Sequence, residues 1–490
     1  MKNTVFSTWA SVIIIALILA YLLIRLFKLE NWLRAVRLVL SLPRPPAVPV
    51  FGNVLMVKNC TEFLDFLINS NRYYGLLTGA WISVIPIVVI IDPEHARKIL
   101  LNTKETQKNF IYTFMDTFLG HGLLTTSGTK WRTHRKLIQP FFHLNTLNLF
   151  INTFAESSEI LVQELRGKSE VKMSTFINVV VLKILHRALM GIPVHDHDTQ
   201  AISPFNKGHL VVLQRLTRPW YILDNIYKFS SISKYESTQR LTLKEFAKKI
   251  LDERRANVGK GEWCLLDSLI KVSETNPHFD DKNIVDEICT FMLAGQDSVG
   301  SATSFTLYNL AKHPEIQQNV VDELDAVFRD YGGINGESLN KMVYLEQCIK
   351  ETLRLYPSVP VISKKLVEDV QLGKYTLPKG LNVLISLIGM QRLEDYYQNP
   401  NKFDPERFAP GNQKGLNQNA FIPFSAGPRN CVANKFALME MKAIIAMVLR
   451  HFKITLPPDY QLQLRYRVTL RARGGIRLRL QPREQSDLRQ

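Results

Sequence analysis

The sequence predicts a mainly helical protein with a small β region (an α+β fold), preceded by one membrane-spanning helix. Three observations lead to this fold class. Residues 5–24 are almost wholly apolar and carry no charge. In the rest of the chain, apolar residues recur mostly at helical spacing. Runs with the alternation or β-branching of strands are few and short.

The first segment is predicted to be a membrane anchor, residues 1–28. About 20 apolar helical residues span a hydrocarbon core roughly 30 Å thick. A cleaved signal peptide is the alternative, but the apolar run is long for one and no clear small-residue cleavage site follows it. The positive-inside rule places the rest of the chain in the cytosol, because only Lys2 precedes the span whereas four basic residues follow it: Arg25, Lys28, Arg34 and Arg37.

Residues 29–52 are predicted to be a basic and proline-rich linker. The prolines between Leu42 and Pro49 favour a stiff, extended chain, although a simple turn into the first strand is compatible with the same residues. No second linker of comparable composition follows, so residues 53–490 are expected to form one large domain. Helices are expected at 281–312, 316–328, 342–355 and 434–452, and strands at 87–91, 381–387 and 475–480.

Composition narrows the possible partners. The formal charge of +17 favours acidic partners, yet no zinc-finger spacing, aromatic-basic RNA-binding run or basic heptad region is present, so nucleic acid is not expected. A membrane surface and an acidic protein remain. Five cysteines at irregular spacing fit neither a disulfide framework nor a zinc site, and they favour a reducing compartment: Cys60, Cys264, Cys289, Cys348 and Cys431.

The strongest chemical signal is the loop from Phe424 to Asn434, which contains Gly427 and Pro428 and leads into a helix. A cysteine at this place, Cys431, meets backbone N–H groups and a favourable helix dipole, both of which stabilise a thiolate, and a thiolate is an iron ligand. Arg429 suits a haem propionate or another carboxylate. An isolated cysteine in such a loop is more often an ordinary buried thiol.

The long helix expected at 281–312 contains Gly295, Gly300 and the polar pair Asp297–Ser298 within an otherwise apolar stretch. Each glycine makes the helix less stable than alanine would, by about 0.5–1 kcal/mol. The pattern therefore indicates a functional site or, alternatively, a helix kink in which Asp297 and Ser298 have their hydrogen bonds satisfied.

Two further pairs share a helical face. Glu351 and Arg354 lie one turn apart, and Trp131 and Arg135 lie four residues apart; surface pairs are the alternative in both cases. The neighbouring basic residues suit the docking of an acidic electron donor or serve solubility alone: Lys130, Arg132 and Lys136.

Taken together, these motifs resemble the cytochrome P450 superfamily. Its haem-loop pattern is Phe, two residues, Gly, one, Arg, one, Cys, one, Gly. The first four positions are met at Phe424, Gly427, Arg429 and Cys431, and Ala433 stands where the last glycine is usual. The resemblance implies a non-covalent haem b (iron protoporphyrin IX) with Cys431 as the axial ligand of the iron.

The resemblance also implies roles for the other motifs. Trp131, Arg135 and Lys364 are expected to contact haem propionates, with Lys364 standing where the family often has arginine. Gly295, Asp297 and Ser298 match the element that accommodates O2 and delivers protons, with serine in place of the usual threonine. The implied buried charge network, which serves folding and haem retention, consists of Glu351, Arg354 and Arg407.

Segments 122–128, 135–137, 140–143 and 357–360 look like the fatty-acid-hydroxylating family-four branch, including its insect members. Many members carry a glutamate that can esterify the haem where this chain has Ala294, so no covalent attachment is expected there. Substrate contacts are expected from residues 115–122, 210–227, 291–294, 359–362 and 471–475.

The implied function is a haem-thiolate monooxygenase that inserts one oxygen atom from O2 into a fatty acid, lipid hormone or xenobiotic. Electrons would come from NADPH through NADPH–cytochrome P450 reductase, with cytochrome b5 as a further candidate partner. The expected location is the endoplasmic reticulum membrane, single-pass, with the catalytic domain on the cytosolic face. Two alternatives remain: a catalytically impaired haem-binding membrane protein, suggested by Ala433 and Ser298, and an isomerase or dehydratase of lipid peroxides, against which Asp297 and Ser298 argue.

Overall fold

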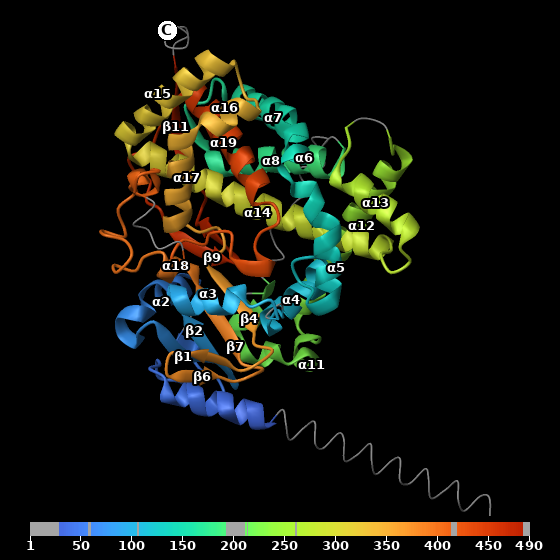
Figure 1. The fold of residues 1–490 in the computed structure, drawn as a ribbon, viewed down its shortest axis with the longest axis vertical. Helices are drawn as coiled ribbons and strands as arrows, with labels where there is room; N and C mark the ends of the chain where they lie inside the picture. Colours follow the sequence, from blue (N-terminus) through green and yellow to red (C-terminus); the bar gives the residue numbers. More distant parts are fainter. Residues whose placement is uncertain are drawn as a thin grey trace, which may run out of the picture.

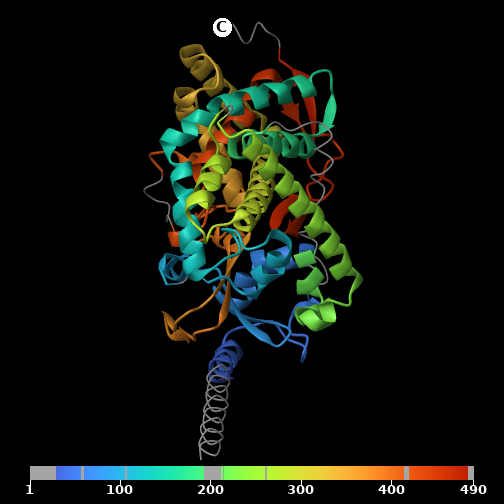
Figure 2. The same cartoon turned by 90° about the vertical axis from the view of Figure 1, so that its right-hand side faces the viewer.

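The computed structural model describes residues 29–56, 60–104, 107–192, 211–212, 214–259, 262–412 and 419–483. Helices make up most of these residues and strands form small sheets, which confirms the predicted fold class (Figures 1 and 2). The predicted anchor at 1–28 lies outside the described residues.

The longest helix, α14 (Asp281–Lys312), begins and ends where the sequence predicts and crosses the middle of the molecule (Figure 1). The Asp280 side chain accepts the Asn283 N–H at its start, and Pro314 follows its end. The other principal helices are α2 (Cys60–Tyr74), α3 (Pro93–Leu101), α4 (Phe110–Leu119), α5 (Gly128–Ile138), α7 (Ile151–Leu165), α8 (Met173–Leu185), α12 (Ser231–Ala256), α13 (Leu265–Thr275), α15 (Pro314–Tyr331), α16 (Gly336–Lys341), α17 (Val343–Leu355) and α19 (Asn434–His451).

The strands form four small sheets. The largest has the order β1-β2-β7-β4, in which β2 and β7 are parallel and the other pairs antiparallel. Its strands are β1 (Leu77–Ile82), β2 (Ile85–Ile90), β7 (Asn382–Ser386) and β4 (Val361–Lys365). The others are β3-β11-β8, with β3 (Glu170–Lys172), β11 (Arg477–Pro482) and β8 (Phe452–Thr455), and the pairs β5 (Val370–Leu372) with β6 (Tyr375–Leu377) and β9 (Leu464–Arg467) with β10 (Thr469–Ala472).

One large apolar core lies among the helices, with α14 packed against α8, α17 and α19. Within the described part of the chain, one stretch, Met173–Met190, is long and apolar enough to cross a membrane. It comprises α8 and the turn after it, and 61% of it is buried inside the protein. It is therefore a core helix, whose apolar surface is matched by the surrounding helices.

The predicted linker at 29–52 contains a helix, residues 29–41, to which the sequence analysis assigned no conformation. Ala35 and Val39 are buried in a second core cluster beneath the largest sheet, and Arg34 pairs with Asp369 at 2.5 Å. The physical reason is burial: these side chains gain an apolar partner surface that a free linker would lack. Residues 43–47, after Leu42, have no regular structure, in keeping with their prolines.

Candidate active site

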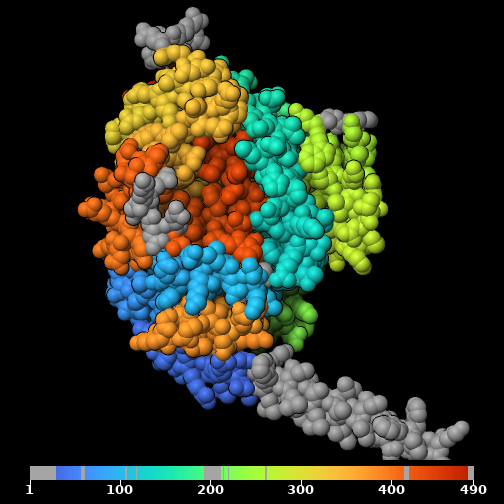
Figure 3. All heavy atoms as spheres, in the orientation of Figure 1, coloured from blue at the N-terminus to red at the C-terminus, as the bar shows by residue number. Residues whose placement is uncertain are grey.

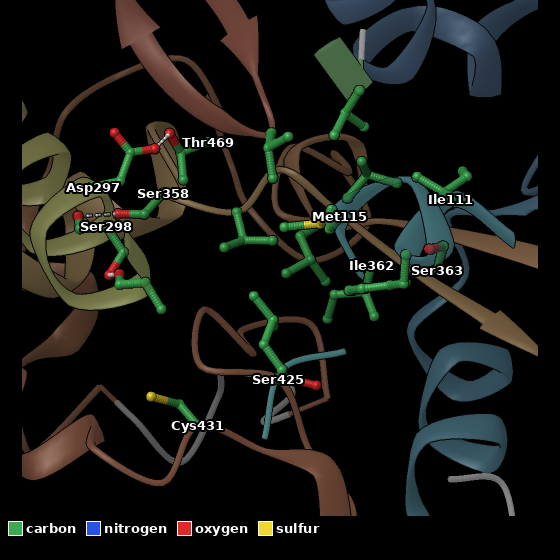
Figure 4. A pocket seen from close by; sticks show the side chains of 18 of the residues that line it. Ile111, Met115, Asp297, Ser298, Ser358, Ile362, Ser363, Ser425, Cys431 and Thr469 are labelled. Atoms are coloured by element: carbon green, nitrogen blue, oxygen red, sulfur yellow. Dashed lines mark hydrogen bonds between the residues drawn. The ribbon is translucent and has the colours of Figure 1, made fainter. Parts of the chain in front are cut away.

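An internal cavity of about 630 Å³ lies between α14, α5, the largest sheet, the β9–β10 hairpin and the loop before α19. This volume is in the range typical of small-molecule and cofactor sites. Its lining is predominantly apolar, and its polar groups gather at a few places. Figure 4 places Cys431 on one side of the cavity, Asp297 and Ser298 on another, and Met115 and Ile362 at a third.

The Cys431 side chain is exposed toward this cavity. Its backbone N–H donates to the Phe424 carbonyl at 2.9 Å, which closes the loop that presents the sulfur. Ser425 and Gly427 both have positive φ, 63° and 70°. A Cβ at Gly427 would lie 2.0 Å from the Leu100 carbonyl oxygen of α3, so glycine is required where the loop crosses that helix. Gly427 thus allows the loop to pack closely against α3, and it does not itself line the cavity.

Burial raises the pKa of the Cys431 thiol, while the Ala433 N–H and the Arg135 guanidinium lower it. The rise outweighs the two opposing effects. The loop and the helix N-terminus therefore do not by themselves supply the thiolate that the sequence pattern predicts. A bound metal cation would supply it, because coordination deprotonates a thiol.

Basic groups surround one end of the cavity. The Arg429 guanidinium lies 4.6 Å from the centroid of the Trp131 ring, and its Nη2 donates to the Leu124 carbonyl at 3.4 Å. Its buried Nη1 has no hydrogen-bond partner among the residues that the structure describes. Burial lowers the pKa of Arg429 to about 10. An arginine with a free buried donor is suited to an anion that enters the cavity.

The other predicted arginine, Arg135, is committed to the cysteine loop. Its Nη1 donates to the Asn430 carbonyl at 2.7 Å and its Nη2 to the Asn430 Oδ1 at 2.8 Å. Burial lowers the pKa of Arg135, and the Cys431 sulfur raises it. This fork fixes the residue directly before the cysteine, a role that the sequence analysis did not anticipate.

Two basic side chains complete the cluster. Lys364 is 1% exposed on β4, and Lys108, just before α4, lies 3.9 Å from the centroid of the Tyr112 ring. Burial lowers the pKa of Lys108 well below its ordinary value, and the charges of Arg429 and Lys364 lower it further. Sequence reasoning missed Lys108 and Tyr112, and no local pattern marks them. Four basic groups thus gather at one end of an apolar cavity, which favours a ligand with negative charge there.

On the α14 side, polar groups are paired within the protein. The Ser298 hydroxyl donates to the Ala294 carbonyl at 2.7 Å, and the Ser298 carbonyl accepts from Ser358 at 2.8 Å. The Asp297 carboxylate pairs with Arg471 and accepts the Thr469 hydroxyl, both from β10 (Figure 4 shows the contact with Thr469).

Gly295 lies beside α8. A Cβ there would be 2.9 Å from Leu185 Cδ2, so a larger residue at this position would require the Leu185 side chain to shift. The neighbouring Ala294 also lines the cavity and carries no carboxylate.

Glu351, Arg354 and Arg407 are brought together. Arg354 donates from Nε and Nη2 to the two Glu351 oxygens at 2.7 and 2.8 Å, and the Arg407 Nε lies 3.5 Å from Glu351 Oε1. The Asp404 N–H also donates to Glu351, at 3.0 Å. Burial raises the pKa of Glu351, and its hydrogen bonds with Arg354 and Asp404 oppose that rise. The network joins α17 to η6 (Pro405–Phe408).

A second buried pair was not predicted. His134 Nδ1 and Glu287 Oε1 lie 2.5 Å apart, with side chains 4% and 0% exposed. Glu287 Oε2 also accepts the Leu123 N–H at 3.0 Å. Because Leu123 and Leu124 line the cavity, this pair from α5 and α14 fixes one of its walls. In the local sequence, the only sign of the His134–Glu287 pair is that His134 follows Trp131 by three residues and therefore shares its helical face.

The class of protein follows from these features. A mainly helical chain presents a cysteine to an apolar cavity with basic groups at one end and an acid–alcohol pair on a central helix, and this arrangement is that of a haem-thiolate enzyme. The family model described as Cytochrome P450 matches residues 42–475. The chain therefore belongs to the cytochrome P450 family and is a cytochrome P450 monooxygenase, an oxidoreductase whose family implies haem.

Similar proteins agree with the family-four resemblance. "Probable cytochrome P450 4aa1" of Drosophila melanogaster is 42% identical over 471 residues, which cover 93% of this chain and 92% of the relative. "Cytochrome P450 4V2" of Mus musculus is 32% identical over 509 residues, covering 98% and 97%. "Cytochrome P450 4c3" of Drosophila melanogaster is 32% identical over 486 residues, covering 92% and 91%. The predicted membership, including the similarity to insect members, is confirmed.

Proposed function

We propose that this chain inserts one oxygen atom from O2 into a lipophilic substrate, with electrons from NADPH delivered by NADPH–cytochrome P450 reductase and with cytochrome b5 as a further candidate donor. The observation that carries the proposal is the apolar cavity that Cys431 shares with Asp297 and Ser298. Fatty acids, lipid hormones and xenobiotics all fit this chemistry.

The residues present fit a haem b held without a covalent bond. The free Nη1 of Arg429 and the buried amino group of Lys108 suit the two propionate groups, together with Lys364, because a bound carboxylate would favour the charged form of Lys108. Ala294 has no carboxylate with which to esterify the haem. Cys431 would hold the iron, and a bound haem thiolate supplies the electron density that favours O–O cleavage and C–H oxidation.

The side chains of the chain set the conditions for that chemistry. Ser298 holds a hydroxyl on the face of α14 that lines the cavity, and Asp297 holds a carboxylate one residue before it. A hydroxyl and a carboxylate side by side can pass protons inward. The apolar lining, which includes Phe66, Met115 and Ile362, excludes water and favours lipophilic substrates.

The surface supports a membrane location. Four of the large apolar side chains in the segment around α11 (Asp224–Tyr227) are well exposed: Trp220, Leu223, Ile226 and Phe229, the last at 90%. The helix at 29–41 exposes Leu29, Trp32 and Leu40, and both ribbon views place it at the same end of the molecule as α11 (Figures 1 and 2). Exposed apolar patches of this kind mark interaction surfaces. We propose an endoplasmic reticulum membrane protein, anchored by residues 1–28, with residues 53–490 on the cytosolic face.

The face that carries the cysteine loop supports an acidic electron donor. In Figure 3 the orange-red residues after 419 lie in a hollow bordered by the teal residues of α5 and the chain that follows it. Exposed basic residues surround this region, and positive charge steers an acidic partner to its site: Lys130, Arg132, Lys136 and Lys435.

The test of the haem-thiolate proposal is the absorption spectrum of the dithionite-reduced protein with CO. The wild type is expected to show the far-red Soret band of a thiolate complex. Cys431→Ala should lose it completely, while Cys289→Ala, a buried cysteine that does not line the cavity, should keep it. A histidine-type or neutral-thiol band in the wild type would contradict the proposal.

Turnover separates the remaining alternatives. With reductase and a lipophilic substrate, NADPH consumption coupled to oxygenated product supports the monooxygenase. Conversion of a lipid hydroperoxide without O2 or reductase would support the isomerase or dehydratase, and haem binding without either activity would support the impaired relative.

A further inference from the structure

Strand β10 contributes two partners to the carboxylate of Asp297. Arg471 Nη2 pairs with one of its oxygens and the Thr469 hydroxyl donates to the other. Arg471 is itself oriented by Asn178, whose Oδ1 accepts from its Nη1 at 3.2 Å. Asp297 is only 7% exposed, so this pairing determines where its carboxylate lies.

Asp297 and Ser298 both line the cavity, but helix geometry turns their side chains in different directions. Neighbouring residues on an α-helix are about 100° apart around its axis. Ser298 contacts the Ala294 carbonyl of the previous turn and Ser358, while Asp297 is turned toward Thr469 of β10 (Figure 4). A direct transfer from Asp297 to an acceptor beside Ser298 would require its carboxylate to turn away from Arg471.

Thr469 offers a route without that movement. It lines the cavity, as do Tyr466 and Val468 of the same hairpin. Its hydroxyl contacts Asp297, and a hydroxyl can donate one proton while it accepts another.

The position of Thr469 is fixed through the next residue, Leu470. The Leu470 N–H donates to the Ser358 carbonyl at 2.9 Å, and the Ser301 hydroxyl donates to the Leu470 carbonyl at 2.5 Å. The hairpin is therefore attached to α14 and to the segment before β4 directly beside the contact between Thr469 and Asp297.

We infer that Thr469 is a second proton-relay hydroxyl of the oxygenation reaction and that Arg471 is the positioning residue that keeps Asp297 in contact with it. In the relay, the Thr469 hydroxyl gives its proton to an acceptor in the cavity and receives, on the same oxygen, a proton that Asp297 has taken up from solvent. Asp297 thereby returns to the carboxylate form that pairs with Arg471. This inference rests on the proposed monooxygenase function.

The central experiment compares Thr469→Val, which removes only the hydroxyl, with Thr469→Ser, which restores it. The matched control is Thr306→Val, because the Thr306 hydroxyl donates to the Ala302 carbonyl of its own helix and Thr306 does not line the cavity. Thr469→Val is expected to form at least about tenfold less product per NADPH oxidised, since positioned general acids contribute roughly 10²–10⁴-fold. Thr469→Ser and Thr306→Val should stay close to the wild type.

Readouts other than turnover distinguish a relay from a structural effect. The substrate dissociation constant, from the substrate-induced shift of the Soret band, should be unchanged in Thr469→Val. The solvent deuterium isotope effect on turnover should increase in the same variant. In the holoenzyme, the unfolding free energies of Thr469→Val and Asp297→Asn should be non-additive, because the two side chains are in contact.

Arg471 is tested by its conservative variant. Arg471→Lys should retain part of the coupling to product, and Arg471→Gln should lose it as Thr469→Val does. If the wild type turns over with NADPH and Thr469→Val matches it in product yield and isotope effect, the relay is wrong while the monooxygenase stands. If the wild type shows no thiolate-type CO band and no turnover, the proposed function itself has failed.

Discussion

Two regions of this protein bury several charges, and they balance them in different ways. Between α17 and η6, Glu351 is surrounded by Arg354, Arg407 and the Asp404 N–H, so the acid and its partners come from the chain itself. At the end of the cavity, Lys108, Lys364 and Arg429 lie near one another, and Arg429 keeps a buried donor without a partner among the described residues.

The difference indicates which region is scaffold and which is binding site. Buried charges that pair within the chain stabilise the fold only as a complete set. Removal of one member leaves the others buried without a counter-charge. A group of buried charges of one sign is electrostatically unfavourable until an anion joins it. The first region should therefore govern folding, and the second should govern retention of an anionic cofactor.

The largest effect is expected when the buried network of Glu351, Arg354 and Arg407 is broken. Glu351→Gln leaves Arg354, which is 0% exposed, without its counter-charge and should lower the free energy of unfolding by about 3–5 kcal/mol. The measurement is chemical denaturation followed by circular dichroism. Glu394→Gln removes one side of an exposed pair with Arg72 and should change the free energy by less than about 1 kcal/mol. Equal effects of the two variants would contradict the scaffold role.

A smaller effect is expected from a substitution in the basic cluster at the end of the cavity, which is formed by Lys108, Lys364 and Arg429. Arg429→Gln should speed transfer of haem to an apoprotein acceptor roughly 10- to 100-fold, since hydrogen bonds to charged groups contribute about 1.5–3 kcal/mol. The haem-free protein should lose little stability, because the substitution removes a buried positive charge that lies beside Lys108. Arg132→Gln, at an exposed position of α5 that does not line the cavity, serves as control. Loss of stability in haem-free Arg429→Gln without faster haem transfer would assign this residue to the scaffold.

The smallest effect is expected on the pH dependence of stability and concerns Glu440. Here a buried carboxyl group avoids its charge by remaining protonated. Its carboxyl is 0% exposed on α19, and both oxygens lack hydrogen-bond partners in the described part of the chain. Burial raises the pKa of Glu440 well above its ordinary value. The folded state thus keeps a proton that the unfolded state releases near pH 4.3.

The sign of the pH effect follows from this pKa. The stability contributed by protonated Glu440 is fully present below about pH 4.3 and is lost progressively as the pH rises toward the folded-state pKa. Glu440→Gln cannot ionise, so the variant should match the wild type at low pH and exceed it at neutral pH. The check is the unfolding free energy as a function of pH. A wild type and a variant with parallel pH profiles would show that Glu440 is already ionised in the folded state.

Much of this arrangement could be predicted from local sequence. The bounds of α14 were predicted without error, α17 begins one residue later than expected, and the strands β2, β7 and β11 differ by one or two residues at their ends. Periodicity and proline positions encode these features directly. The cysteine loop could also be identified, because its glycine, arginine and cysteine lie within a few residues of one another.

The structure supplied what depends on distant contacts. The segment 29–41 is helical because a core surface formed by later residues accepts its apolar side chains. Near the carboxyl end the cavity is lined by Tyr466, Val468 and Thr469, which precede the segment 471–475 predicted for this role. A one-residue change of register in a hairpin reverses which side chains face inward, and sequence alone does not fix that register.

The sequence by itself determined the family, the helical class, the ligand candidate Cys431 and the position of Asp297 and Ser298 on one long helix. The tertiary structure decided that Arg135 supports the cysteine loop, that Lys108 joins Arg429 more than 300 residues away along the chain, and that Arg471 holds Asp297. The physical reason is that helix and turn preferences act over a few residues, whereas the balance of buried charges is set by whichever segments the fold brings together.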